Sequence, residues 1–102
     1  MSEAHRIRLE GFWKPLESGD GVSRSFGRPR TIDDDEIVEV VGHCTAAYEL
    51  FVNTERIGEA LRDGTFRWPI PMPLKPRNVI IFKTQGDVTD AAMEIRRVTP
   101  PT

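Results

Sequence analysis

The sequence predicts an all-β domain, an antiparallel β-sandwich of seven to eight short strands. Apolar and polar residues alternate over short segments, as at Phe66, Trp68 and Ile70, and this period of two is typical of half-buried strands. Turn residues interrupt these segments about every ten residues. No stretch shows the helical period of a long amphipathic helix. Together these observations favour a sandwich or barrel.

Three strands are expected in the N-terminal part of the chain. Residues 7–13 are rich in apolar side chains, with Gly11 as an expected kink or bulge. The proline and glycine residues of 14–21 predict a loop, and residues 22–26 alternate as a short strand. Residues 31–41 contain four carboxylates at positions 33–36, which favour a helix N-terminus. Their β-branched end favours a strand instead, with the acidic run as its solvated lead-in.

The middle of the chain predicts a β-hairpin. Residues 47–53 alternate as a strand, residues 53–55 form the turn, and residues 56–58 return. The Asn-Thr pair in this turn is a weaker signal than the Asn-Gly pair that a tight primed turn prefers. Residues 60–64 are expected to form one helical turn or a loop.

Three further strands are expected towards the C-terminus, at residues 65–70, 78–83 and 91–98. Prolines follow the first of them, and proline cannot donate to a strand ladder, so this strand must lie at an edge or end early. The run Val79-Ile80-Ile81-Phe82 predicts a core strand. Residues 85–90 are expected to form a polar turn.

The length of 102 residues suits one domain. We expect a flexible arm over residues 1–5, a single sandwich over residues 6–98 and a tail over residues 99–102. The formal net charge of −2 disfavours nucleic-acid binding, because counterion release rewards a basic excess. One cysteine excludes an intrachain disulfide. Without a signal peptide or a membrane-spanning apolar run, the default expectation is a cytoplasmic protein.

The order of motifs in residues 48–82 resembles the sugar-binding domains of β-galactosidase-like and β-glucuronidase-like hydrolases. A strand ends in a turn at Asn53, returns through Arg56-Ile57-Gly58, and is followed by Leu74-Lys75-Pro76 and Asn78 before a core strand. The upstream Leu9-Glu10-Gly11-Phe12-Trp13 is similar to the opening of those domains. The resemblance implies a galactose-binding-like jelly roll and a non-catalytic scaffold or binding role. Thr54 departs from it, since a glycine is usual there.

Aromatic residues supply the first candidate sites. Trp13, Trp68 and Tyr48 are candidates for stacking on a sugar ring, although core packing is the usual fate of large rings in a small domain. Trp68 is the better of the two tryptophans, because the neighbouring prolines favour an edge position for its strand.

Polar clusters supply the remaining candidates. Arg24, Arg28 and Arg30 form a potential polar surface, with a solvated loop as the plain alternative. The acidic run 33–36 lacks the spaced ligands of a calcium loop, and no metal site or cofactor is predicted. His43 and Cys44 are adjacent in a strand and therefore point to opposite faces, which disfavours a catalytic pair.

These observations predict a non-catalytic module that binds carbohydrate or acts as a scaffold. The alternative is a structural or protein-interaction domain without a small ligand. An oligonucleotide-binding barrel is a third hypothesis, which the net charge disfavours. No enzyme is expected, because the sequence has no phosphate-binding glycine loop and no nucleophile elbow. The expected partner is a carbohydrate or a protein; the sequence does not define an oligomeric state.

Overall fold

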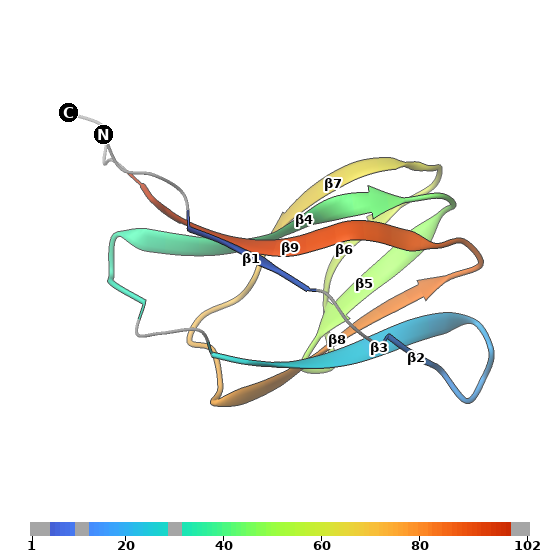
Figure 1. Ribbon diagram of the computed structural model, residues 1–102, viewed down its shortest axis with the longest axis horizontal. Coiled ribbons are helices and arrows are strands. Elements are labelled where there is room, and N and C mark those ends of the chain that lie inside the picture. Colours follow the sequence, from blue (N-terminus) through green and yellow to red (C-terminus); the bar gives the residue numbers. More distant parts are fainter. Residues whose placement is uncertain (1–4, 10–12, 29–31, 99–102) are drawn as a thin grey trace.

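A computed structural model describes residues 5–9, 13–28 and 32–98. These residues form two antiparallel sheets that pack face to face, and they contain no helix (Figure 1). Within the same residues there is accordingly no helix that could cross a membrane. The predicted antiparallel sandwich is confirmed, with nine strands in the described ranges instead of seven to eight.

The strands divide into a sheet of four and a sheet of five. The four-stranded sheet has the order β1 (His5–Arg8), β9 (Val88–Arg97), β4 (Glu36–Cys44), β7 (Gly64–Pro69). The five-stranded sheet has the order β2 (Lys14–Pro15), β3 (Gly21–Gly27), β8 (Arg77–Thr84), β5 (Tyr48–Val52), β6 (Glu55–Ala60). Three of the pairs are nested, since β3 pairs with β8, β4 with β7 and β5 with β6. The galactose-binding jelly roll itself stays a prediction.

The inner faces of both sheets form the core. Phe82 on β8 lies at its centre, and its ring centroid is 5.3 Å from that of Phe66, 5.8 Å from Tyr48 and 5.9 Å from Trp13. Burial alternates along β8, as the side-chain period of a strand requires. The predicted core strand over residues 78–83 is therefore confirmed.

The N-terminal segment differs from its prediction as a single strand over residues 7–13. β1 pairs with β9 in one sheet, whereas β2, which lies in the predicted loop, pairs with β3 in the other sheet. The chain thus changes sheets between Leu9 and Trp13, which a single strand does not do. Gly11, the expected bulge, lies outside the described residues.

The other boundaries follow the predictions with small shifts. The predicted turn over residues 85–90 is shorter, because β9 already begins at Val88. Asn53 and Thr54 form a two-residue hairpin with positive φ angles of 50° and 71°, and residues 61–63 form a loop. β7 is an edge strand that ends at Pro69, as its prolines predicted.

Candidate functional site

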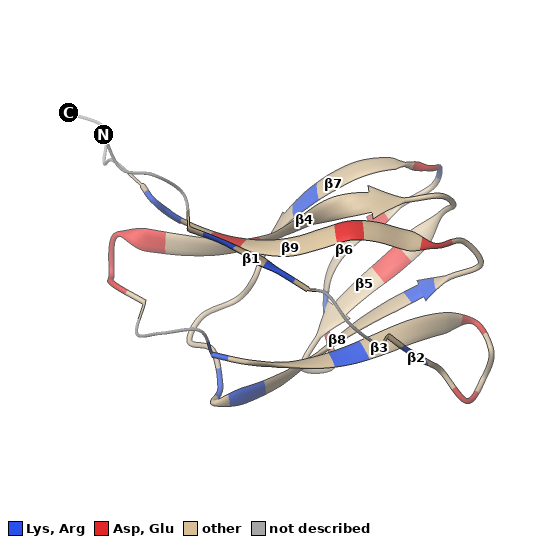
Figure 2. Ribbon diagram, viewed as in Figure 1, with Lys and Arg blue, Asp and Glu red and all other residues tan. Residues whose placement is uncertain are grey.

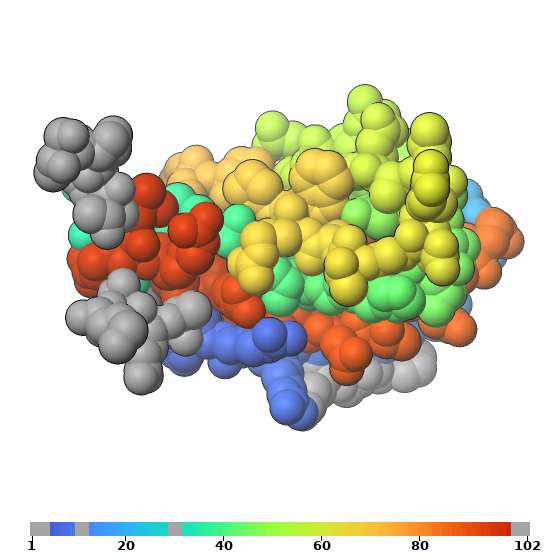
Figure 3. Space-filling model, turned by 90° about the horizontal axis from the view of Figure 1, so that it is seen from above, coloured from blue at the N-terminus to red at the C-terminus, as the bar shows by residue number. Residues whose placement is uncertain are grey.

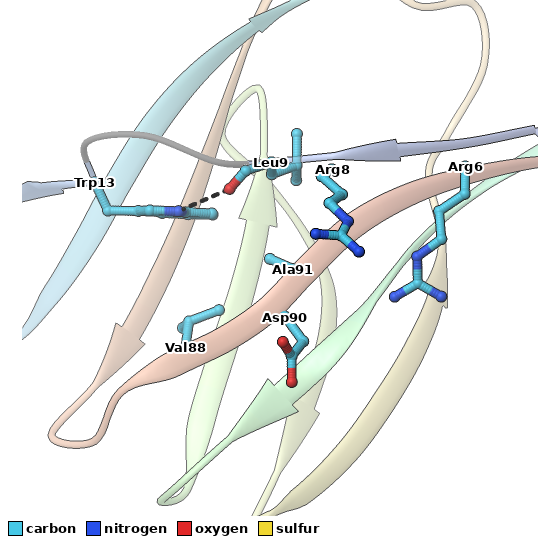
Figure 4. A pocket seen from close by; sticks show the side chains of 7 residues that line it. All are labelled: Arg6, Arg8, Leu9, Trp13, Val88, Asp90 and Ala91. Carbon is cyan, nitrogen blue, oxygen red and sulfur yellow. Dashed lines mark hydrogen bonds between the residues drawn. The ribbon is translucent and has the colours of Figure 1, made fainter.

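Two adjacent cavities lie along the four-stranded sheet. The edge cavity, of about 510 Å³, opens where β1 ends, and its lining consists of Arg6, Arg8, Leu9, Trp13, Val88, Asp90 and Ala91 (Figure 4). The face cavity, of about 350 Å³, lies on the outer face, and its lining consists of Arg6, Val41, Gly42, His43, Thr65, Phe66, Arg67 and Asp90. Arg6 and Asp90 line both cavities. Figure 3 looks onto this face, where β1 (blue), β9 (orange-red), β4 (green) and β7 (yellow) lie side by side.

The edge cavity lies where β1 stops pairing with β9. The last residue pair is Arg8 with Ala92, so the first residues of β9, from Val88 on, have no β1 residue beside them. The last backbone bond between the two segments runs from Leu9 N to Ala91 O, at 2.9 Å. Trp13 forms one wall of the edge cavity, and its indole Nε1 donates to the Leu9 carbonyl oxygen at 3.2 Å (Figure 4). Its ring also meets Phe82 edge to face, at an interplanar angle of 61°. Trp13 is thus held in place by the core while its exposed part forms a wall of the cavity.

Asp90 owes its position to a β-bulge. Val41 pairs with Ala92 and His43 pairs with Thr89, so Gly42 alone faces two residues of β9. Asp90 is the one with a left-handed backbone, at a φ of 54°, a conformation that aspartate tolerates better than most residues. A bulge redirects the side chain it carries. Within the described part of the chain, the Asp90 carboxylate makes no hydrogen bond or ion pair.

Arginine and glutamate side chains form a network beside the two cavities. Figure 2 marks the basic positions on β1 and β7 in blue and the acidic positions on β9 in red. Glu94 on β9 accepts from Arg6 Nη1 at 3.1 Å and from Arg67 Nη1 at 2.7 Å. The Arg67 Nη1 atom also lies 2.9 Å from Oε1 of Glu39, which accepts from Arg96 Nε at 2.9 Å as well. The network therefore links all four strands and fixes the guanidinium groups of Arg6 and Arg67 next to the cavities.

Glu39 is unusual because it is only 6% exposed on the outer face of a sheet. Desolvation raises the pKa of its carboxyl, but the hydrogen bonds and charges of Arg96 and Arg67 outweigh that effect. The pKa of Glu39 therefore lies below its usual value of 4.5, and the group is charged at neutral pH.

The three stacking candidates separate in the structure. Trp13 lines the edge cavity, whereas Trp68 lies half-buried on the inner face of β7 and donates from Nε1 to the Tyr48 hydroxyl at 2.7 Å. Tyr48 is 5% exposed. Burial raises the pKa of its phenol above 10, and this effect outweighs the hydrogen bond from Trp68, which lowers that pKa. Tyr48 also lines a separate hollow of about 390 Å³, together with residues of β6 and of the end of β8. The structure thus brings Trp68 and Tyr48 together inside the sandwich, away from Trp13.

Of the three arginine candidates, the structure describes Arg24 and Arg28. Arg24 pairs with Ile80 in the β3–β8 register, which places it half-buried on the inner side of the sheet. Arg28 is exposed just beyond β3, where its backbone nitrogen donates to Pro76 O at 3.2 Å. Arg30 lies outside the described residues. Neither Arg24 nor Arg28 lines the edge cavity or the face cavity.

The remaining polar motifs have structural partners. Asp33 and Asp35 in the acidic run form ion pairs with Arg97 on β9. His43 points outwards into the face cavity, whereas Cys44 is buried with its Sγ 3.5 Å from Thr84 Oγ1, so the two do point to opposite faces. In the described ranges no three His, Cys, Asp or Glu side chains group in a way that could hold a metal ion.

Arg6, Arg8 and Asp90 were not among the residues that the sequence singled out. Arg6 and Arg8 alternate with Ile7 and Leu9, which marks them as outward-facing, but nothing in the local sequence connects them with a residue more than eighty positions away. The pairing of β1 with β9 alone makes them neighbours of Asp90.

The chain matches no protein-family model and no curated protein sequence. Fold and site together define its class as an antiparallel β-sandwich with a polar cavity, walled by one tryptophan, at the edge of a sheet.

Proposed function

We propose that this protein is a non-catalytic carbohydrate-binding module and that the edge cavity is its binding site. The observation that carries the proposal is the meeting of one indole, two guanidinium groups and one carboxylate in a single cavity (Figure 4). A cavity of this volume falls within the roughly 300–1,000 Å³ of small-molecule sites.

The chemistry of the lining matches the two kinds of surface on a sugar. The apolar C–H face of a pyranose packs on an aromatic ring, for which the exposed part of Trp13 is suited. Sugar hydroxyls both donate and accept hydrogen bonds. Asp90 supplies an acceptor that no described side chain occupies, and Arg6 supplies donors in a fixed plane. The cavity thus offers convergent polar groups around an apolar wall.

The lining favours binding over hydrolysis of a sugar. Glycosidases commonly use two carboxylates that flank the scissile bond. Among the described residues that line the edge cavity, Asp90 is the one carboxylate. The other charged residues of the lining are Arg6 and Arg8, which stay protonated and do not act as general acids at neutral pH.

The strand order gives independent support. The nested pairs β3–β8, β4–β7 and β5–β6 are the order expected when one long hairpin rolls into a sandwich, which is how a jelly roll is built. This supports the resemblance to galactose-binding-like sugar-binding domains.

A glycan array followed by calorimetric titration tests the proposal. We expect binding to at least one glycan at micromolar to millimolar concentration, weakened about tenfold or more in Asp90→Gly. Glycine removes the carboxylate and tolerates the left-handed backbone of this position. Asp63→Gly, in an exposed loop that lines neither cavity, is the matched control and should bind as the wild type does. Absence of binding to every glycan at millimolar concentration would refute the proposal.

A protein-interaction domain is the second candidate function. The observation in its favour is β7, whose outer edge has no partner strand in the described sheet. A free edge can accept a strand from another chain. Light scattering coupled to size-exclusion chromatography tests self-association through this edge, and a monomer at high concentration would argue against it.

A further inference from the structure

We infer that the edge cavity and the face cavity form one groove that binds a linear oligosaccharide, with one sugar ring in each cavity. This inference rests on the proposed carbohydrate-binding function and adds the class of ligand: an internal stretch of a chain, as opposed to a single terminal sugar.

The shared walls carry the inference. Arg6 on β1 and Asp90 on β9 belong to the lining of both cavities, so the two hollows are neighbours with these two side chains at their common boundary. Each cavity taken alone, at about 510 and 350 Å³, has the size of a small-molecule site. In the groove that we infer, the ligand crosses from one cavity to the other at Arg6 and Asp90.

The ion-pair network fixes one wall of the face cavity. The Nη1 atom of Arg67 is held by Glu39 at 2.9 Å and by Glu94 at 2.7 Å. The same glutamate, Glu94, holds Arg6 Nη1 at 3.1 Å. Both guanidinium groups are therefore held in place by glutamates, and both belong to the lining of the face cavity together with His43 and Thr65.

The two cavities offer different contacts to a sugar. The edge cavity has the indole of Trp13 and suits a ring that packs through its apolar face. The face cavity is lined by the polar residues His43, Thr65 and Arg67. The buried Val41 belongs to the same lining. The three polar side chains suit hydrogen bonding to hydroxyls along the edge of a second ring. The ligand thus stacks at one end and is bound by polar contacts at the other.

A chain-length series tests the inference by calorimetric titration of the full chain. The probes are linear 1,4-linked series of glucose, xylose, mannose and galacturonic acid, each from the monosaccharide to the tetrasaccharide. In the series that binds, we expect the affinity to rise about tenfold or more from the monosaccharide to the di- or trisaccharide and then to level off, as the second cavity fills.

A variant that blocks one cavity locates the second ring. Thr65 is exposed on β7, so Thr65→Tyr fills the face cavity without touching the core, and tyrosine suits a strand. The trisaccharide should then bind only as tightly as the monosaccharide, whose affinity is unchanged. Ser25→Tyr, at an exposed position of β3 in the other sheet, is the matched control and should keep the full chain-length dependence.

The outcomes separate the inference from the proposal beneath it. Equal affinity for monosaccharide and trisaccharide, or a trisaccharide affinity that Thr65→Tyr leaves unchanged, would overturn the two-cavity groove while the carbohydrate-binding function stands. Failure of every series and of every glycan on the array to bind would overturn the carbohydrate-binding function itself.

Discussion

The Nη1 atom of Arg67 on β7 lies 2.7 Å from Oε1 of Glu94 on β9, although β4 runs between these two strands. The Arg67 side chain therefore crosses β4 on the outer face of the sheet. Val41 and Ala92, whose register places them on the same face, are 5% and 0% exposed without belonging to the core cluster. Long arginine stems can cover apolar surface in this way while their charged ends stay in water.

We expect Arg67→Ala to lower the free energy of unfolding by about 1–3 kcal/mol, because it uncovers apolar surface and removes a charged hydrogen bond to Glu39. Arg67→Met, which keeps much of the stem, should lose less than Arg67→Ala. Urea unfolding measures both, with Arg62→Ala in an exposed loop as the control. Equal stability of Arg67→Ala and the wild type would show that the stem covers nothing of consequence.

The lowered pKa of Glu39 predicts a dependence of stability on pH. Because the folded-state pKa lies below the usual 4.5, the ionised group stabilises the fold fully above that value, and this contribution is lost as the pH falls through the folded-state pKa. Glu39→Gln should be less stable than the wild type at neutral pH, and the difference should shrink below pH 4.5. Unfolding curves over this range measure it; a difference that does not change with pH would contradict the assignment.

Gly58 on β6 leaves room for Trp68 on β7. A Cβ atom at residue 58 would lie 2.4 Å from Cδ2 of the Trp68 ring, closer than real contacts allow. We therefore expect Gly58→Ala to destabilise the fold by roughly 1–3 kcal/mol through overpacking. Gly27→Ala, whose Cβ would meet its nearest neighbour at 3.7 Å, is the matched control and should change stability little. Thermal unfolding distinguishes the two variants, and similar melting temperatures would contradict the prediction.

Asn78 is fully buried at the start of β8, and its amide joins three segments of the chain. Its Oδ1 accepts from Lys75 N at 3.0 Å and Asn53 Nδ2 at 2.9 Å, and its Nδ2 donates to Lys75 O at 2.8 Å. Asn78→Ala should cost about 2–4 kcal/mol, because it leaves these buried groups without partners. Chemical denaturation measures the loss. Gln85→Ala, at an exposed position, should stay within about 0.5 kcal/mol of the wild type.

Thr54 adopts a left-handed backbone, at a φ of 71°, which a β-branched residue disfavours. Thr54→Gly should raise the free energy of unfolding by about 0.5–1 kcal/mol, since the strain it relieves exceeds the entropy that glycine adds to the unfolded chain. Thr45→Gly serves as the contrasting variant. Because the Thr45 hydroxyl accepts from Asp87 N at 2.7 Å, its loss should lower the free energy of unfolding. A lower melting temperature for Thr54→Gly would show that the threonine hydroxyl matters more than the strain.

The fold could be predicted in part because its signals are local. The alternation at Phe66, Trp68 and Ile70 and the run from Val79 to Phe82 each depend on neighbours in the chain, so their strands were located from the sequence. The short β2 was missed because two residues carry no period, and Pro15 indicated a loop.

Of the residues that line the candidate site, only Trp13 could be predicted from the sequence. Trp13 was a stacking candidate, but so was Trp68, and their rings have the same chemistry in the sequence. Packing separates them: Trp68 faces Gly58 and bonds to Tyr48, whereas Trp13 lies where the chain changes sheets.

The sequence by itself determined the class of this protein, because the two-residue period of its apolar side chains requires strands with one buried face, and two such sheets cover each other. It also determined that no intrachain disulfide holds the fold together, because the chain has one cysteine. The tertiary structure alone decided the site. Arg6 and Asp90 line the same cavities because β1 pairs with β9 and because Asp90 lies in a bulge opposite Gly42. Both relationships join residues that are too distant in the chain for a local pattern to indicate.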